Sequence, residues 1–257
     1  MSRVMVLLYG VASYAIALVV FLYSMGFIVG FQTPTMLDGV PDRPIGQALL
    51  IDLALLAAFA LQHSIMARPA FKAWCTRIVP TAAERSTYVL ASSIAFGALC
   101  FWWAPIGGVV WDAPPGLLRN GIIALYVFGW ALLLFTTFLI DHFDLFGLTQ
   151  VWRYFTRQTY RAPQFHTPSL YRVVRHPLYI GWLTIFWAAP TMTVAHLVFA
   201  LITTAYILVA IRFEERDLVD HFGDRYLAYR ERTPMLVPRL AGEKRRPRAL
   251  AETQARE

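Results

Sequence analysis

Charge is scarce in this sequence: only 15% of its 257 residues are Asp, Glu, Lys or Arg, whereas 58% are hydrophobic. A soluble globular domain usually carries about 25% charged residues. The chain therefore has too little polar surface to cover a water-facing domain of its size, and we expect lipid to be its solvent. Its length permits one helical bundle with a short polar tail.

Cysteine is scarce too, because the chain has only Cys75 and Cys100, without CxxC or metal-ligand spacing. We expect no disulfide from them. The first apolar run, residues 4–31, is too long for the core of a signal peptide and lacks a small-residue cleavage site, which indicates a retained helix. The net charge of +7 does not indicate nucleic-acid binding, because 11 of the 23 Lys and Arg lie from Arg212 onward and most others flank apolar segments.

What the sequence does have is long apolar runs. Residues 4–31, 45–66, 88–104 and 121–140 each approach or exceed the roughly 20 residues that cross a bilayer core as a helix. We therefore predict an all-α fold, a polytopic membrane helix bundle with four transmembrane helices, followed by a membrane helical hairpin near the C-terminus.

The hairpin is predicted from residues 178–211, an apolar stretch interrupted near Pro190 and His196. As one helix this stretch would extend about 51 Å, well beyond a bilayer core of about 30 Å. Because proline ends helices, we expect two helices joined by a turn at residues 190–195, and neither needs to cross fully. We interpret His196 as a turn residue.

The distribution of basic residues predicts the orientation. The connections 67–86 and 141–177 contain four and five Lys and Arg and the region from Arg212 contains eleven, whereas 32–44 and 105–120 contain one each. Basic connections remain in the cytoplasm. We therefore expect a protein of the cytoplasmic (inner) membrane whose functional groups face the cytoplasm.

Four segments follow from this organisation. Residues 1–140 would form the N-terminal transmembrane helices on the substrate side, and residues 178–238 the membrane hairpin with a cofactor-binding region. Residues 141–177 are too polar to span and rich in aromatics, which predicts cytoplasmic interfacial helices. Residues 239–257 read as a charged, solvated tail.

Two polar motifs flank the predicted hairpin. Residues 175–181 read RHPLYIG where the chain enters it, and residues 212–215 read RFEE where the chain leaves it, followed by FG at 222–223, Tyr226 and Pro238. Since a hairpin brings its two ends together, we expect both motifs to meet at the cytoplasmic interface. Taken alone, such Arg, Tyr and Glu residues could equally be interfacial anchors.

The order of these motifs over about residues 168–238 resembles the superfamily of isoprenylcysteine carboxyl methyltransferases and phospholipid methyltransferases. Residues 62–68, QHSIMAR, and 141–148, DHFDLFGL, are similar to one branch, the bacterial methanethiol S-methyltransferases. The resemblance implies S-adenosylmethionine as cofactor and a small thiol as acceptor: methanethiol yielding dimethyl sulfide, with hydrogen sulfide as a second acceptor. The residues that the resemblance or the chemistry assigns to the cofactor are Arg175, His176, Pro177, Tyr179, Gly181, Arg212, Glu214, Glu215 and Tyr226.

The chemistry of this cofactor suits those residue types. A carboxylate such as Glu215 suits its ammonium or ribose, while Arg175 or Arg212 could bind its carboxylate through charge-assisted hydrogen bonds. The face of Tyr179 could hold adenine or lie near the sulfonium. Gly181 would permit close approach of a helix or of the ligand.

The acceptor side requires polar groups from the N-terminal helices. Gln62, His63, Asp141 and His142 lie at the cytoplasmic ends of two predicted spans, where polar residues are costly and therefore candidates for function. Because thiolate is the nucleophile, we expect His63 to act as the base, with Asp141 or His142 orienting it or sharing the proton. The same side chains could instead only hydrogen-bond neighbouring helices. His166 and His221 read as surface residues, and the spacing of the histidines predicts no metal site.

Other functions stay open at this point. A lipid or prenylated substrate would use the same methyl-transfer chemistry. A non-enzymatic membrane protein could bind haem between His63 and His142, since haem iron takes axial histidines. A transporter would show repeated broken helices, and the sequence has a single interrupted segment. Beyond the surrounding membrane lipid, the sequence indicates neither a nucleic-acid partner nor an oligomeric state.

Overall fold

The computed structural model describes residues 2–238, so the predicted tail at 239–257 lies outside the described residues. The long helices are α1 (Arg3–Val29), α2 (Ile45–Ala67), α4 (Glu84–Trp102), α5 (Leu117–Leu139) and α9 (Val194–Phe222). The shorter helices are α3 (Pro69–Cys75), α6 (His142–Leu145), α7 (Leu148–Phe155), α8 (Pro177–Trp187) and α10 (Asp224–Arg232), with 3-10 turns η1 (Thr81–Ala83) and η2 (Ser169–Arg172). Strands β1 (Val109–Asp112) and β2 (Thr191–Thr193) pair antiparallel. The predicted all-α bundle is confirmed.

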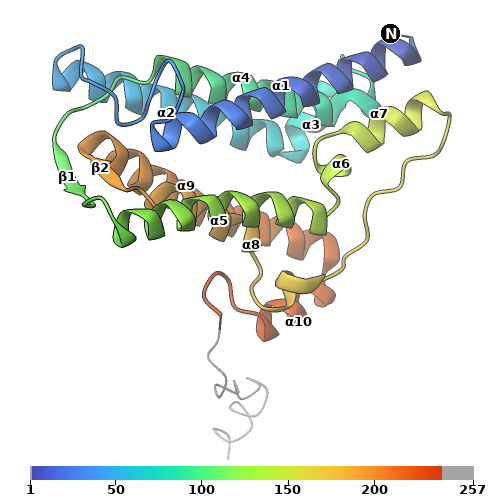
Figure 1. Cartoon of the computed structure of the whole chain (residues 1–257). Helices are drawn as coiled ribbons and strands as arrows, with labels where there is room; N and C mark the ends of the chain where they lie inside the picture. Colours follow the sequence, from blue (N-terminus) through green and yellow to red (C-terminus); the bar gives the residue numbers. More distant parts are fainter. Residues whose placement is uncertain (1, 239–257) are drawn as a thin grey trace, which may run out of the picture.

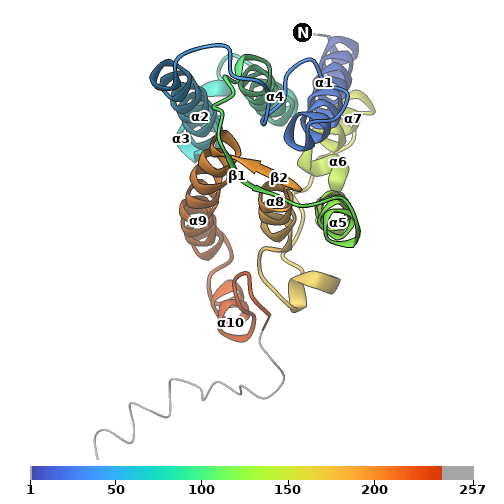
Figure 2. The same cartoon turned by 60° about the vertical axis from the view of Figure 1, so that its left-hand side comes forward.

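The long helices form two layers (Figures 1 and 2). One layer contains α1, α2 and α4, with α4 packed against both of the others, and the second contains α5, α8 and α9. Aromatic side chains join the layers: the ring of Phe21 on α1 lies 5.0 Å from Trp130 on α5 and 5.6 Å from Trp182 on α8. Edge-to-face aromatic contacts of this kind stabilise beyond their buried area alone.

Four of the described helices are long and apolar enough to cross a membrane: α1, α2, α5 and α9. Helix α4, which covers the predicted span at 88–104, is not among the four. The sequence places several hydroxyl side chains on α4, and they hydrogen-bond within the bundle, as Ser93 does to the carbonyl of Val89 at 2.8 Å. Its position between α1 and α2 tolerates this polarity.

The predicted hairpin consists of two unequal helices. Helix α8 has 11 residues and is about 16 Å long, too short to cross the bilayer core, whereas α9 has 29 residues. The turn contains β2, which lies beside β1 from the α4–α5 connection. The chain thus reverses close to the predicted position, around Pro190.

His196 corrects the prediction of a turn residue, because it lies in the first turn of α9 and is 1% exposed. Its Nδ1 lies 2.7 Å from Oδ2 of Asp38, and its Nε2 lies 3.0 Å from the carbonyl oxygen of Phe186. Asp38 also accepts a hydrogen bond from the hydroxyl of Thr193 at 2.5 Å. The connection between α1 and α2 is thereby fixed to the turn of the hairpin.

Helices α5 and α8 approach closely at two glycines. A Cβ atom at Gly181 would lie 3.0 Å from the backbone nitrogen of Leu133, and one at Gly129 would lie 2.9 Å from Cγ1 of Ile185. The predicted need for close approach at Gly181 is therefore met by helix α5.

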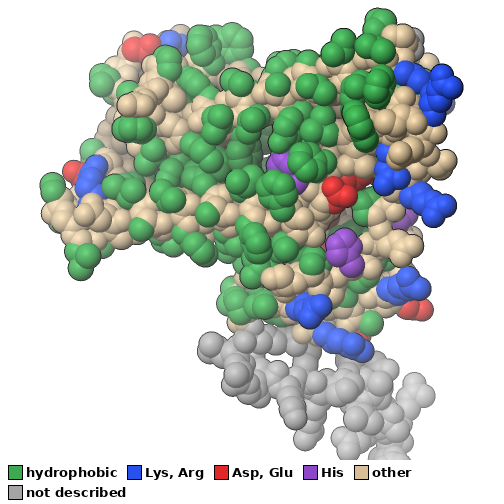
Figure 3. Space-filling view, turned by 45° about the vertical axis from the view of Figure 1, so that its right-hand side comes forward, with side chains coloured by type: hydrophobic (Ala, Val, Ile, Leu, Met, Phe, Trp, Pro, Cys, Tyr) green, Lys and Arg blue, Asp and Glu red, His purple; other side chains and the backbone are tan. Residues whose placement is uncertain are grey.

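Most Lys and Arg side chains visible in Figure 3 gather at one end and along the lower edge of the molecule, while hydrophobic side chains cover much of the remaining face. Helix α7 packs against α1 at this basic end. From α7 the chain continues through residues 158–168, here called the strap, which has neither helix nor strand and leads to η2. The interfacial position of residues 141–177 stays a prediction.

Candidate active site

The two motifs that flank the hairpin meet in the structure. Nε of Arg175 donates to Oε1 of Glu215 at 2.6 Å, and Nε2 of His176 lies 3.0 Å from the same oxygen. The side chains of Arg175 and Glu215 are only 10% and 12% exposed, and that of His176 is 4% exposed. Charge-assisted hydrogen bonds shielded from water are among the stronger polar contacts in proteins. We call these three residues the clasp.

The clasp also binds the chain that follows α10. The guanidinium of Arg175 donates to the carbonyl oxygens of Arg230 at 3.0 Å and Thr233 at 2.5 Å. The backbone nitrogen of Arg175 donates to the carbonyl of Pro234 at 2.8 Å. The hydrogen bonds of this guanidinium therefore go to protein groups. From sequence, Arg175 or Arg212 was expected to bind the carboxylate of the cofactor.

Glu214 lies beside the clasp but has a different environment. The hydroxyl of Tyr179 donates to its Oε2 at 2.9 Å, and its side chain is 45% exposed. Pro177, at the first position of α8, has the backbone angle that starts a helix and directs Tyr179 toward α9. The two adjacent glutamates therefore differ in solvent exposure: Glu215 is largely buried and Glu214 is partly exposed.

Two tyrosines that the sequence did not single out connect this region to the first layer. Tyr88 on α4 and Tyr206 on α9 are electrostatic neighbours of Tyr179. The hydroxyl of Tyr206 lies 3.0 Å from Oγ of Ser64 on α2. The two layers therefore face each other here through hydroxyl groups rather than through apolar packing alone.

His63 lies on the α2 side of this tyrosine group. The hydroxyl of Tyr88 is 2.9 Å from its Nε2, and Oγ of Ser92 is 3.1 Å from its Nδ1. The preceding residue, Gln62, donates from Nε2 to Ser92 at 3.3 Å, while its buried Oε1 has no hydrogen-bond partner among the described residues. A buried acceptor without a donor is unusual and calls for an explanation.

His142 does not join His63. Its Nε2 lies 2.9 Å from the hydroxyl of Tyr14 on α1, and its Nδ1 lies 2.8 Å from Oγ1 of Thr137 on α5. Burial lowers the pKa of His142, while the nearby Asp141 carboxylate acts in the opposite direction. Because the two histidines share no hydrogen-bond or ring partner in the described part of the chain, neither a shared proton nor a common haem receives support from these contacts.

Asp141 has a left-handed backbone with φ of 82°, an uncommon conformation for a residue with a side chain. Its carboxylate accepts a hydrogen bond from the backbone of Asp144 at 3.1 Å. Asp141 borders an open groove of about 560 Å³ between the end of α5 and the strap. The groove is lined by Phe138, Leu139, Asp141, His142, Phe143, Pro163, Gln164, Phe165 and His166.

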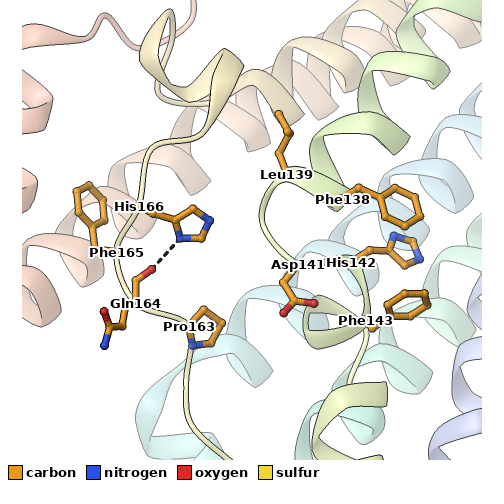
Figure 4. A pocket seen from close by; sticks show the side chains of 9 residues that line it. All are labelled: Phe138, Leu139, Asp141, His142, Phe143, Pro163, Gln164, Phe165 and His166. Atoms are coloured by element: carbon orange, nitrogen blue, oxygen red, sulfur yellow. Dashed lines mark hydrogen bonds between the residues drawn. The ribbon is translucent and has the colours of Figure 1, made fainter.

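Figure 4 shows how these side chains lie. His166 points from the strap toward the α5–α6 corner where Asp141 lies, while Phe138, His142 and Phe143 point away from the strap. Nδ1 of His166 donates to the carbonyl of Gln164 at 2.9 Å. His166, interpreted from sequence as a surface residue, therefore borders a groove.

The two remaining predicted cofactor residues differ in burial. Tyr226 is 2% exposed, with its ring centre 5.9 Å from that of Phe165 on the strap and 5.7 Å from that of Tyr229. Burial raises the pKa of Tyr226. Arg212 is exposed and makes no hydrogen bond or ion pair with another described residue. The structure thus brings Tyr226 next to the strap and leaves Arg212 at the surface.

Comparison with known proteins agrees with this arrangement. The family model for phospholipid methyltransferase matches residues 123–225. A methanethiol S-methyltransferase of Crocosphaera subtropica is 52% identical over 93% of this chain and 93% of its own. Methanethiol S-methyltransferase 2 of Bradyrhizobium diazoefficiens is 47% identical, with 95% and 94% covered. This chain belongs to the methanethiol S-methyltransferase family.

Two further relatives extend the comparison. A family member from Mycobacterium tuberculosis is 46% identical over 93% of this chain and 98% of its own. Nurim of Rattus norvegicus is 31% identical over 71% of this chain and 72% of its own. No solved structure matches the sequence. With four apolar helices and this family membership, the chain is an integral membrane protein.

The polar groups that sequence reasoning missed in this methyltransferase are Tyr88, Ser92 and Tyr206. Each lies inside a helix at a position that no sequence motif marks. One signal was available: Tyr88 and Ser92 are four positions apart and therefore share one face of α4. That face is the one that meets His63.

Proposed function

We propose that this chain transfers a methyl group from S-adenosylmethionine to methanethiol and so forms dimethyl sulfide. The observation that carries the proposal is the identity of 46% to 52% with methanethiol S-methyltransferases over at least 93% of this chain. Similarity at this level over almost the full length of both chains makes a shared reaction the expected outcome. Hydrogen sulfide is a second acceptor of the same chemistry.

The residues at the two motifs fit this cofactor. Glu214 has a carboxylate that is partly open, and the only hydrogen bond that it accepts from the described side chains comes from Tyr179. An open carboxylate beside an aromatic ring suits a ligand that carries an ammonium and a sulfonium. Glu214 and Tyr179 would therefore hold the cationic part of S-adenosylmethionine, which supplies the electrophilic methyl group when bound.

The clasp has a supporting part in this proposal. Arg175, His176 and Glu215 satisfy one another and leave little charge for a ligand. Their contacts fix the start of α8 relative to α9, and this places Tyr179 against Glu214. A rigid support of this kind keeps binding groups in position.

The acceptor would bind between the tyrosine group and His63. His63 can accept a proton from the thiol or pass one to Tyr88, whose hydroxyl lies 2.9 Å away. The unpartnered oxygen of Gln62 can accept the weak S–H donor of a thiol. Helices α2 and α4 would thus provide the acceptor side and α8 and α9 the cofactor side.

The orientation in the membrane belongs to the proposal as well. The clasp and the basic connections lie toward the same end of the bundle, and basic connections stay in the cytoplasm. We therefore place the site at the cytoplasmic face of the inner membrane, where S-adenosylmethionine is available.

The test is calorimetric binding of S-adenosylmethionine and S-adenosylhomocysteine to detergent-purified protein, followed by headspace detection of dimethyl sulfide after addition of methanethiol. His63→Ala should reduce turnover and leave cofactor binding nearly unchanged, whereas the exposed His221→Ala serves as the matched control and should change neither. Cofactor binding without dimethyl sulfide would retain a methyltransferase and reject this acceptor. No binding by folded protein would reject the proposal.

A further inference from the structure

Arg85 lies in the first turn of α4, next to the proposed acceptor site. Its Nε donates to the carbonyl oxygen of Leu145 at 2.8 Å, and its guanidinium carbon lies 5.3 Å from the ring centre of Tyr88. The hydrogen bond holds Nε in place, and the contact with the ring of Tyr88 holds the guanidinium beside that ring. In the sequence, Arg85 is one of the four basic residues of the connection 67–86, which predict only the orientation in the membrane.

The charge of Arg85 is not neutralised by an ion pair within the described residues. Its electrostatic neighbours are His63 on α2, Tyr88 on α4, and Asp144 and Tyr160 near α6 and the strap. Asp144 accepts a hydrogen bond from Tyr160 at 3.2 Å rather than from Arg85. The positive charge is therefore available to the region around His63.

A charge of the opposite sign reaches this region from another helix. Glu214 on α9 is an electrostatic neighbour of Tyr88 and Tyr179, so the tyrosine group lies between a guanidinium and a carboxylate. This separation matches the two charges of the proposed reaction, a cationic cofactor and an anionic acceptor. We infer that Arg85 supplies the positive charge that holds the acceptor as a thiolate; this rests on the proposed function.

Arg85 would favour loss of the proton from the thiol of the acceptor. The S–H bond of the thiol breaks, its electron pair stays on sulfur, and the proton passes through His63 to water and buffer, because Arg85 disfavours a second positive charge on His63. The thiol of free cysteine has a pKa of about 8.5, and a simple alkyl thiol such as methanethiol is a weaker acid. An opposite charge within a few ångströms lowers such a pKa by about 1–3 units, which raises a small thiolate fraction at neutral pH by about 10- to 1000-fold.

Proton release on thiol binding tests the inference without turnover. Methanethiol is titrated into the full chain saturated with S-adenosylhomocysteine, in two buffers of different ionisation heat at pH 7, so that the protons released per thiol can be counted. The wild type should release a measurable fraction of a proton per thiol and Arg85→Gln at least tenfold less, whereas Arg85→Lys should restore release. Arg77→Gln, an exposed arginine of the preceding segment, is the matched control and should behave as the wild type.

A second measurement records dimethyl sulfide formation against pH. In Arg85→Gln the pH at which the rate of dimethyl sulfide formation rises should be higher by about 1–3 units, and the rate should recover at high pH. If Arg85→Gln is not recovered folded, Arg85→Met replaces it, because its apolar stem still covers Tyr88. If a folded Arg85 variant releases as many protons as the wild type and its rate rises at the same pH, the inference is overturned. Absence of turnover in the wild type would count against the proposed function instead.

Discussion

The two adjacent glutamates at the end of the hairpin should respond oppositely to the same substitution. Glu215 shares one oxygen with Arg175 and His176, in a place where the Arg175 and Glu215 side chains are only 10% and 12% exposed. Removing one partner of a buried ion pair costs about 3–5 kcal/mol. Because glutamine retains one acceptor oxygen, we expect Glu215→Gln to lose about 3 kcal/mol of unfolding free energy, near the lower limit of that range.

This loss can be measured as a change in Tm. For chains of about this size 1 kcal/mol corresponds to about 2–4 °C, so Glu215→Gln should unfold about 6–12 °C below the wild type in the same detergent. Glu214→Gln changes a side chain that is 45% exposed and bonded to a neutral tyrosine. Its Tm should shift by no more than about 2 °C, since surface substitutions usually stay within about 0.5 kcal/mol.

Binding should show the reverse order. A hydrogen bond to a charged group contributes about 1.5–3 kcal/mol, so loss of the Glu214 charge should weaken S-adenosylhomocysteine binding about 10- to 100-fold by calorimetry. Folded Glu215→Gln should bind within a few-fold of the wild type. Asp220→Asn, exposed on the same helix, is the control for loss of one charge and should alter neither quantity. If Glu215→Gln keeps its Tm and loses binding while Glu214→Gln does the opposite, the roles assigned to the two residues are wrong.

Three further predictions concern other parts of the bundle. Burial lowers the pKa of His142 in the fold below its ordinary value of 6.5, so protonation of His142 favours the unfolded chain and thermal stability should fall as the pH drops through and below 6.5. In His142→Gln the Tm should depend less on pH in this range. A pH dependence of the Tm equal to that of the wild type would contradict the prediction. Gly181→Ala should cost about 1–3 kcal/mol in unfolding because its Cβ would press on Leu133, whereas Gly121→Ala, with nothing within 4 Å, should cost nothing; equal Tm values would refute the close approach. Tyr179→Phe should weaken S-adenosylhomocysteine binding about tenfold by calorimetry through loss of its hydrogen bond to Glu214, and unchanged affinity would remove Tyr179 from the proposed site.

The meeting of the two motifs could be predicted from the sequence because it requires only local information. An apolar stretch too long for one crossing, with Pro190 inside it, has to reverse, and the reversal brings Arg175 and Glu215 to the same end. Helix lengths and the break between α8 and α9 follow from the same pattern. What the pattern did not contain was the difference in burial between Glu215 and Glu214, on which their proposed roles depend.

The acceptor side was harder to predict. His63 stood out because a polar residue at the end of an apolar run is costly, but its partners lie on another helix, with Tyr88 near the start of α4 and Ser92 near its middle. Their position depends on how α2 packs against α4, and no local periodicity specifies that pairing. For the same reason α4 read as an ordinary span, although its hydroxyl groups are adapted to a place between two other helices.

His196 was misjudged because its partner is 158 positions away. The carbonyl of Phe186 can only accept, so Nε2 of His196 donates to it, while Nδ1 lies 2.7 Å from Oδ2 of Asp38. Replacing either residue alone would leave a buried polar group without its partner, at a cost of about 1–3 kcal/mol. Over evolutionary time these two distant positions are therefore expected to change together, as a pair inherited or lost in one lineage, even though neither contacts the proposed site.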